Sequence, residues 1–184
     1  MDFLALVKTR QSVREYLNKS VEREKVERCL EAARLAPSAS NAQPWRFIVV
    51  DDPELKEAVA RKTFDRLISF NWFSLQAPVL IVLISRRSSI VSKIGEAIKD
   101  KQFSLIDIGI AAEHLCLQAT DEGLGTCMLG WFDEKGVKKL LNIPRTKRVE
   151  LIICMGYPAS NEIRPKKRKD LNKIRSYNHY KLQE

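Results

Sequence analysis

The strongest periodic pattern of the chain lies between residues 22 and 36. Four apolar residues recur there at spacings of three and four: Val26, Cys29, Leu30 and Ala33. This spacing places them on one face of a helix. We expect Ser20 to cap that helix and Pro37 to end it.

Shorter patterns predict the remaining elements. Residues 2–8 have an amphipathic pattern typical of a short helix, and the pattern breaks into a loop at 10–14. Asp52 before Pro53 marks the start of another helix, and a further helix is expected over 133–142 with its first residue as the cap. Four apolar runs have the length of a strand: 47–50, 77–84, 126–129 and 149–155.

The segment 103–122 is apolar on nearly every face and is followed by Gly123, which is typical of a helix end. A helix that is apolar all round must be buried on most sides. In a chain of this length, a second copy of the chain is a natural source of that cover. The preceding segment 85–101 is rich in Ser, Arg and Lys, and we expect a lid or disorder there.

The order of these elements decides the fold class. Helices and strands alternate, but no glycine-rich turn joins a strand directly to a helix, so a dinucleotide-binding fingerprint is absent. The pattern favours an α+β sandwich with a small mixed sheet between helices. The length of 184 residues and the 45% hydrophobic content fit one domain over 1–184. Residues from about 156–184 form a polar C-terminal arm without helical periodicity.

Composition limits the location of the protein and its metal chemistry. No apolar run approaches the roughly 20 residues of a membrane span, and the start lacks the features of a secretory signal. We therefore expect a cytoplasmic protein with no membrane partner. The two histidines exclude a multi-histidine metal site. Four cysteines among apolar neighbours are expected to be reduced core residues: Cys29, Cys116, Cys127 and Cys154.

The net charge of +9 and a pI near 9.5 favour an anionic ligand. A phosphorylated cofactor, a nucleic acid or an anionic surface would each fit. The densest basic run, 164–169, is by itself most simply a solvated tail. A nucleic-acid-binding module is an alternative, but aromatic residues do not interleave with the basic ones as stacking platforms would. We therefore expect no nucleic-acid partner.

Three polar segments stand where folding alone does not require them. Arg10, Ser12 and Arg14 supply charge and a hydroxyl donor, as a bound phosphate needs. The loop 37–43 and the run that holds Lys166 and Arg168 follow later in the chain. Each of these segments is weak evidence when taken alone.

In this order the three segments resemble the nitroreductase family of FMN enzymes. The sequence RQSVR at 10–14 is similar to the family's RRSxR signature, and APSASNAQPWRF at 36–47 is similar to its PSxxNxQPWxF loop and strand. The segments 107–112 and 123–130 look like the family's buried helix and flavin-facing strand. The resemblance covers about residues 3–171. Trp45 and Phe47 are interpreted as core residues.

The resemblance implies a set of FMN-binding residues: Arg10, Gln11, Ser12, Arg14, Pro37, Ser38, Ala39, Asn41, Met128, Leu129, Gly130, Lys166 and Arg168. Arg10, Lys166 and Arg168 would hold the phosphate. Ser12 and Arg14 would reach the ribityl chain and the pyrimidine edge. The loop residues would approach the flavin from the other subunit, and 128–130 would lie along the ring. Asn71 is left as a further candidate.

The implied activity is hydride transfer from NADH or NADPH, through flavin N5, to a small acceptor such as a nitroaromatic or quinone, in a ping-pong sequence. No catalytic acid or base of the protein is required, because the cofactor carries the chemistry. The resemblance also implies a homodimer with FMN at its interface. Other flavin reactions on the same fold remain open, namely reductive dehalogenation, flavin destruction and azoline oxidation.

Overall fold

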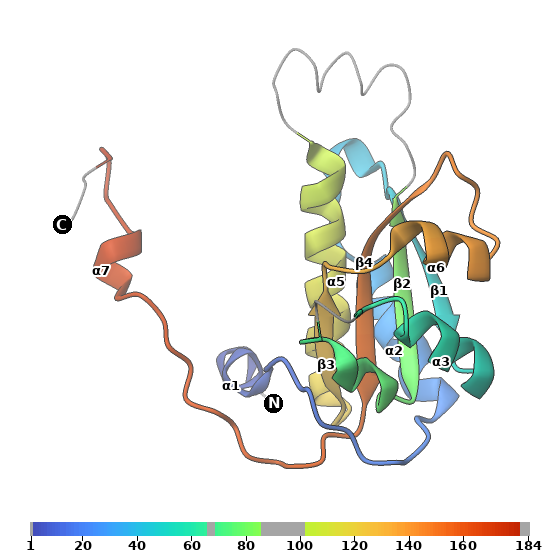
Figure 1. Cartoon of the computed structure of the whole chain (residues 1–184). Coiled ribbons are helices and arrows are strands. Elements are labelled where there is room, and N and C mark those ends of the chain that lie inside the picture. The colour runs from blue at the N-terminus through green and yellow to red at the C-terminus, as the bar shows by residue number, and fades with distance from the viewer. Residues whose placement is uncertain (1, 66–68, 86–101, 181–184) are drawn as a thin grey trace.

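The computed structural model describes residues 2–65, 69–85 and 102–180 and shows helices packed on a small antiparallel sheet (Figure 1). The strands are β1 (Trp45–Val50), β2 (Val79–Ser85), β3 (Gly125–Leu129) and β4 (Arg148–Gly156). The helices are α1 (Phe3–Thr9), α2 (Arg23–Arg34), α3 (Pro53–Ala60), α5 (Phe103–Asp121), α6 (Glu134–Leu140) and α7 (Leu171–Ile174). Two single 3₁₀ turns, η1 (Ala39–Asn41) and η2 (Trp72–Leu75), complete the described elements. The predicted α+β class is confirmed.

The sheet has the strand order β1-β2-β4-β3, and all three neighbouring pairs are antiparallel. The expectation of a mixed sheet is met only at one parallel bridge, between Ser12 and Thr126 on the outer edge of β3. The difference has a physical reason. Hydrophobic alternation fixes which side chains are buried, but it carries no information about the direction of a neighbouring strand.

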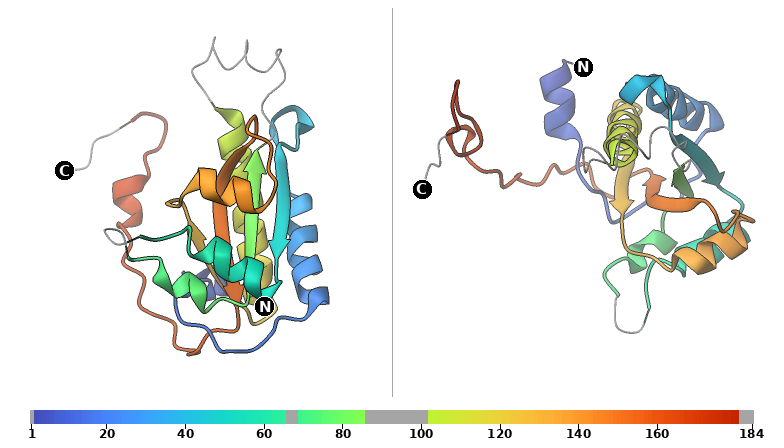
Figure 2. Two further views of the ribbon diagram at one scale, coloured as in Figure 1. Left: turned by 45° about the vertical axis from the view of Figure 1, so that its right-hand side comes forward. Right: turned by 90° about the horizontal axis from the view of Figure 1, so that it is seen from above.

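Alternate residues of β2 supply the two hydrophobic layers of the protein. Val79, Ile81 and Leu83 face the layer covered by α2 and α5, whereas Leu80 and Val82 face the layer covered by α3, α6 and η2. Figure 2 shows these helices on the two faces of the sheet. All seven residues of β2 are buried. Burying one Val, Leu or Ile side chain contributes about 1.5–3 kcal/mol, so this central strand holds the two layers together.

Helix α5 buries one side against its own chain. The buried side consists of Asp107, Ile108, Ala111, Ala112, Leu115, Cys116 and Ala119. On another side, Leu105 and Ile106 are 44% and 55% exposed. Gly123 follows the helix with φ +75°, a left-handed value that glycine adopts without strain, as the sequence predicted. The chain therefore covers only part of this apolar helix.

Two of the predicted helix caps are confirmed and one is wrong. The side chain of Asp52 accepts the N–H of Leu55, and that of Asp133 accepts the N–H of Gly136. Ser20 does not cap α2, because the helix begins at Arg23 and Glu22 occupies the cap position. The carboxylate of Glu22 instead accepts the hydroxyl of Tyr157 at 2.6 Å, which ties the helix start to the end of β4.

Other expectations have mixed outcomes. Ser85 is the last residue of β2, so it does not belong to the expected lid, and 86–101 lie outside the described residues.

The C-terminal arm is exposed and leaves the body on the side of α1, with the short α7 as its regular element (Figures 1 and 2). No helix among the described residues is long and apolar enough to span a membrane.

The four cysteines are free and buried, as predicted. Burial raises the pKa of the Cys29 and Cys116 thiols to about 12. The nucleophilic form of a cysteine is the thiolate. These two side chains are therefore unreactive core residues at neutral pH.

An ion pair at the end of α5 predicts an acid-sensitive contribution to stability. The guanidinium of Arg28, followed by the side chain of Gln118, lowers the pKa of Glu122 from its ordinary 4.5 to about 2. Because the folded pKa is the lower one, this contribution is present above about pH 4.5 and is lost as the pH falls toward 2. We expect the replacement Glu122→Gln to reduce the loss of unfolding free energy between pH 7 and pH 3 by up to about 1 kcal/mol. Urea titrations at both pH values measure it.

The matched control is Glu27→Gln. Glu27 pairs with Arg23 at 3.9 Å, and both side chains are largely exposed. The pH dependence of this variant should equal that of the wild type. An identical pH dependence in Glu122→Gln would show that the Arg28 pair contributes nothing.

Candidate cofactor-binding site

The N-terminal segment 10–14 runs along the outer edge of β3. The N–H of Val13 donates to the carbonyl of Thr126 at 2.9 Å, next to the bridge between Ser12 and Thr126. Gly125 permits this approach, because a Cβ at that position would lie 2.5 Å from Cγ2 of Val13. The fold thus brings two of the predicted site segments, 10–14 and the strand that leads to Gly130, side by side.

The C-terminal arm binds to the same segment from the far end of the sequence. Gln11 donates from Nε2 to the carbonyl of Glu162 at 2.8 Å, and its Oε1 accepts the backbone N–H of Arg164 at 3.2 Å. The guanidinium of Arg164 also donates to Oε1 of Gln11 and to the carbonyl of Ser12. These contacts place the C-terminal arm against Gln11 and Ser12, at the N-terminal segment of the candidate site.

Three predicted phosphate ligands form a cluster of positive charge. Lys166 donates from Nζ to the carbonyl of Val7 at 2.7 Å and also to that of Lys8, at the end of α1. Burial lowers the pKa of Lys166, and the positive charges of Arg10 and Arg168 lower it further. These cations therefore lie close enough to repel one another.

One acid offsets part of this charge. Nε of Arg10 lies 3.0 Å from Oε1 of Glu113 on α5, and the Arg10 side chain is 22% exposed. The guanidinium of Arg168 donates to the carbonyl of Lys167 at 2.9 Å. A bound anion at this cluster would relieve the repulsion, which is the electrostatic requirement of a phosphate site.

The end of β3 offers open space. Met128 is half-buried, Leu129 is buried and Gly130 is exposed. A Cβ on Gly130 would meet no atom within 4 Å, so nothing in this chain crowds the glycine. The room beside Gly130 is compatible with a planar ligand lying against the backbone.

Aromatic residues lie beside this space. The rings of Phe70 and Trp131 meet edge to face with centroids 6.3 Å apart. Asn71 is buried and donates from Nδ2 to the carbonyl of Trp131 at 3.2 Å. Asn71 therefore lies near the end of β3, where it supports the residue after Gly130. Arg14 is exposed, with its guanidinium 5.9 Å from the centroid of Phe73.

The predicted loop residues lie elsewhere in the chain. The N–H of Ala39 donates to Oδ1 of Asp107 on α5 at 3.1 Å, and Oγ of Ser38 accepts the N–H of Gln43 at 3.0 Å. Pro37 and Asn41 are exposed. The hydrogen bonds of this loop stay within the loop or reach α5 at Asp107. Residues 10–14 instead pair with β3, contact the C-terminal arm and reach α5 further along, at Glu113. Each copy of the chain therefore holds two separate groups of predicted site residues.

Sequence reasoning missed three side chains that the structure brings into these groups. Arg164 was part of the basic run, but an extended arm has no periodicity to show which of its cations turns inward. Asp107 and Glu113 are the two acids within the largely apolar body of α5, before Asp121 at its end. The position of Asp107 was itself a usable signal, because acidic side chains are rarely buried without a partner.

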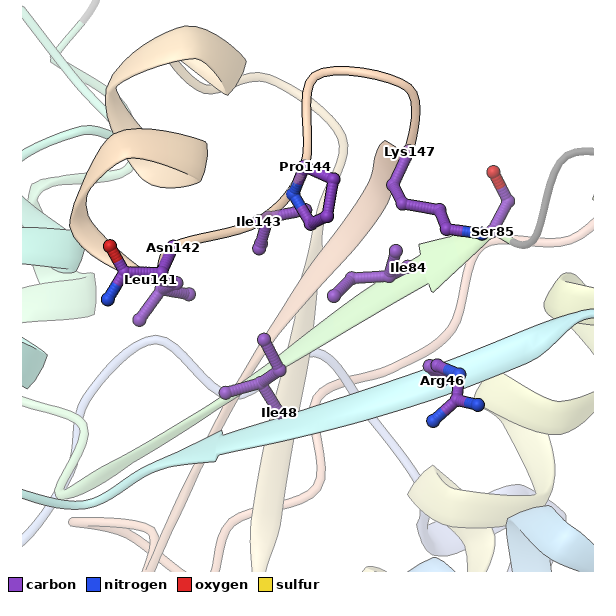
Figure 3. Close-up of a pocket in the computed structure, with 9 residues that line it drawn as sticks. All are labelled: Arg46, Ile48, Ile84, Ser85, Leu141, Asn142, Ile143, Pro144 and Lys147. Carbon is purple, nitrogen blue, oxygen red and sulfur yellow. The ribbon is translucent and has the colours of Figure 1, made fainter.

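A cavity of about 380 Å³ opens near the free edge of the sheet, between the ends of β1 and β2 and the segment that follows α6 (Figure 3). Its lining combines aliphatic side chains with two cations: Arg46, Ile48, Ile84, Ser85, Leu141, Asn142, Ile143, Pro144 and Lys147. None of these residues is a predicted site residue. The cavity and the candidate cofactor site are therefore different places in the fold.

Comparison with known proteins identifies the family of most of the chain. The model of the Nitroreductase family matches residues 7–75 and 71–157. A relative from Methanothermobacter thermautotrophicus, whose name pairs NADH dehydrogenase with NAD(P)H nitroreductase, is 32% identical over 88% of this chain and 80% of its own length. The iodotyrosine deiodinase of Thermotoga neapolitana is 31% identical over 83% of this chain and 87% of its own length.

Solved structures show the same architecture. An FMN-dependent nitroreductase from Clostridium difficile R20291 is similar with a TM-score of 0.74 and 29% identity, over 97% of this chain and 100% of that one. The similarity therefore includes the segments that hold 10–14, the loop after α2 and the end of β3.

Proposed function

The chain belongs to the nitroreductase family, and on that premise we propose that it is an FMN-dependent oxidoreductase. In this proposal it takes a hydride from NADH or NADPH and delivers it to a small acceptor such as a nitroaromatic or a quinone. The observation that carries the proposal is the cation cluster of Arg10, Lys166 and Arg168, in which Lys166 binds the end of α1 just before Arg10, next to the segment that pairs with β3.

The residues present fit the phosphate of FMN. A phosphate monoester carries a charge of about −1.5 to −2 at neutral pH. The cluster has three cations, of which Arg10 pairs with the carboxylate of Glu113. Arginine and lysine together supply charge-assisted donors for several phosphate oxygens. Bound FMN supplies the hydride-transfer chemistry itself.

The other proposed contacts are made by residues around the open space at the end of β3. Ser12 and Arg14 would hold the ribityl chain and the pyrimidine edge, and the cation of Arg14 would raise the reduction potential of a flavin beside it. Gln11 keeps this segment in place through Glu162 and Arg164. Met128, Leu129 and Gly130 would lie along the ring, with a backbone N–H directed at it.

The separation of the two groups of residues supports a shared site in a homodimer. The loop residues Pro37, Ser38, Ala39 and Asn41 would then contact the flavin held by the partner subunit. Exposed Leu105 and Ile106 on α5 supply an apolar surface for two-fold pairing. The exposed C-terminal arm extends away from its own sheet, as a segment that wraps a partner would (Figure 1).

Purification followed by flavin analysis tests the proposal. The protein should be yellow, and heat should release FMN, identified by chromatography against FAD. NADH or NADPH oxidation should then depend on added nitroaromatic or quinone. Finding FAD, or no flavin after incubation with FMN, would contradict the assignment.

Reductive dehalogenation is a second candidate, favoured by the 31% identity to the iodotyrosine deiodinase of Thermotoga neapolitana. The same preparation separates the two reactions. Release of iodide from an iodinated phenol by the reduced protein, without comparable turnover of nitroaromatics or quinones, would favour this candidate.

A further inference from the structure

Helix α5 contains one acid on its buried side. Asp107 is 5% exposed and lies beside Ile108, one turn before Ala111. A buried carboxylate costs free energy unless it accepts hydrogen bonds. Within residues 2–65, 69–85 and 102–180, no Lys, Arg or His forms a salt bridge with it. The acid therefore calls for an explanation other than charge pairing.

The carboxylate binds the backbone of the loop after α2. Oδ1 of Asp107 accepts the N–H of Ala39 at 3.1 Å. Ala39 is the first residue of η1, the single turn between α2 and β1. The bond gives the buried carboxyl group a backbone partner, which offsets part of the cost of burying it. The contact joins the loop to the most buried helix of the protein.

The loop is held in a strained conformation. Ser40, Asn41 and Gln43 have φ values of 51°, 52° and 44°, in the left-handed region that side chains other than glycine rarely adopt. Such a conformation persists only where several surrounding contacts hold it in place. Bonds that involve side chains close the loop on itself, among them those from the N–H of Gln43 to Oγ of Ser38 and from its Nε2 to Oδ1 of Asn41.

These internal bonds fix the shape of the loop but not its place. The bond from Ala39 to Asp107 fixes the loop relative to α5. We infer that Asp107 is a positioning residue, which anchors the loop 38–43 so that Ser38, Ala39 and Asn41 are presented to FMN in one fixed arrangement. This inference rests on the proposed function, because it gives the anchored loop a flavin to contact.

Two replacements at position 107 test the acceptor. Asp107→Asn keeps a side-chain carbonyl that can accept the N–H of Ala39, whereas Asp107→Leu keeps the branching at Cγ and has no acceptor. Asp121→Leu changes an exposed acid of the same helix and is the matched control. All variants are compared with the wild type at the same protein concentration.

The first measurement is amide hydrogen exchange at Ala39 by NMR, with FMN in saturating excess. Exchange should be about 10- to 100-fold faster in Asp107→Leu, the equivalent of one hydrogen bond to a charged group. Asp107→Asn and Asp121→Leu should exchange within about threefold of the wild type. Equal exchange in Asp107→Leu and the wild type would overturn the anchoring.

The second measurement is the dissociation constant of FMN. Asp107→Leu should bind FMN at least about tenfold more weakly, and Asp107→Asn should restore most of the affinity. Faster exchange at Ala39 with unchanged FMN affinity would overturn the role toward the flavin. If the wild type binds no FMN, the proposed function fails, and the exchange at Ala39 still decides whether Asp107 anchors the loop.

A variant on the other side of the bond covers the case in which Asp107→Leu does not fold. Ala39→Pro removes the donor N–H and leaves α5 unchanged. Ser38 has φ −145° and ψ 152°, a conformation suited to a residue before proline. Ala39→Pro should weaken FMN binding as Asp107→Leu does. Unchanged affinity in this variant would contradict the inference.

Discussion

Replacing Ile106 with aspartate is expected to give a monomer that no longer retains FMN. Ile106 is 55% exposed and adjoins Leu105 on the uncovered side of α5. In the proposed two-fold dimer, with this side of α5 at the interface, the replaced residue occurs in both copies, so the interface would gain two desolvated carboxylates of like charge. Such juxtaposition costs several kcal/mol, and the dimer dissociation constant should rise at least about 100-fold.

Sedimentation over a dilution series, with flavin fluorescence followed in parallel, measures both effects. Leu17→Asp is the control, because Leu17 is similarly exposed at 46% but lies in the segment between the site and α2. Its dimer should be unchanged. A monomeric Ile106→Asp protein that keeps stoichiometric FMN and full turnover would refute the shared site.

Replacing Gly125 with valine is expected to destabilise the protein and to displace the segment 12–14. The new Cβ would lie 2.5 Å from Cγ2 and 2.8 Å from Cβ of Val13, and Val13 is itself held to Thr126 by a backbone hydrogen bond. Overpacking of this kind costs about 1–3 kcal/mol or more. FMN binding should fall with it, because Ser12 and Arg14 move. Urea unfolding and FMN titration measure the two losses.

Gly130→Ala supplies the contrast, because its Cβ would meet open space in this chain. Its unfolding free energy in the absence of FMN should stay within about 0.5 kcal/mol of the wild type. Its FMN affinity should nevertheless drop if the flavin lies against this backbone. Unchanged FMN binding in Gly130→Ala would remove Gly130 from the proposed site. Unchanged stability in Gly125→Val would show that the segment 12–14 can move away from β3 without a cost in unfolding free energy.

The sequence predicted features that depend on a few neighbouring residues. The caps at Asp52 and Asp133 and the helix end at Gly123 follow from side-chain length and backbone freedom within one turn. The predicted cap at Ser20 was wrong because α2 begins at Arg23, which leaves Ser20 two residues before the cap position. The Glu22 at that position bonds to Tyr157, a distant residue that no local pattern indicates. Strand directions also escaped prediction, since they depend on contacts between segments far apart in the chain.

For the candidate site, too, some residues could be predicted from the sequence, whereas contacts between distant segments could not. The resemblance named Arg10 and Lys166 as phosphate ligands, and the structure brings them within electrostatic range of each other. Arg164 was not singled out, because its contacts with Gln11 and Ser12 join ends of the chain that no local pattern connects. The anchoring of Ala39 by Asp107 is likewise a contact between distant segments.

The pairing of β2 with β4 also determines when the protein can fold during synthesis. Leu80 pairs with Cys154, so the centre of the sheet joins residues from opposite halves of the chain. Until Arg148–Gly156 leaves the ribosome, one edge of a fully buried strand has no partner, and unpaired apolar edges promote aggregation. Such non-local pairing is slow to form. A nascent chain that stalls before β4 would therefore depend on chaperones, because no shorter piece completes either layer of the core.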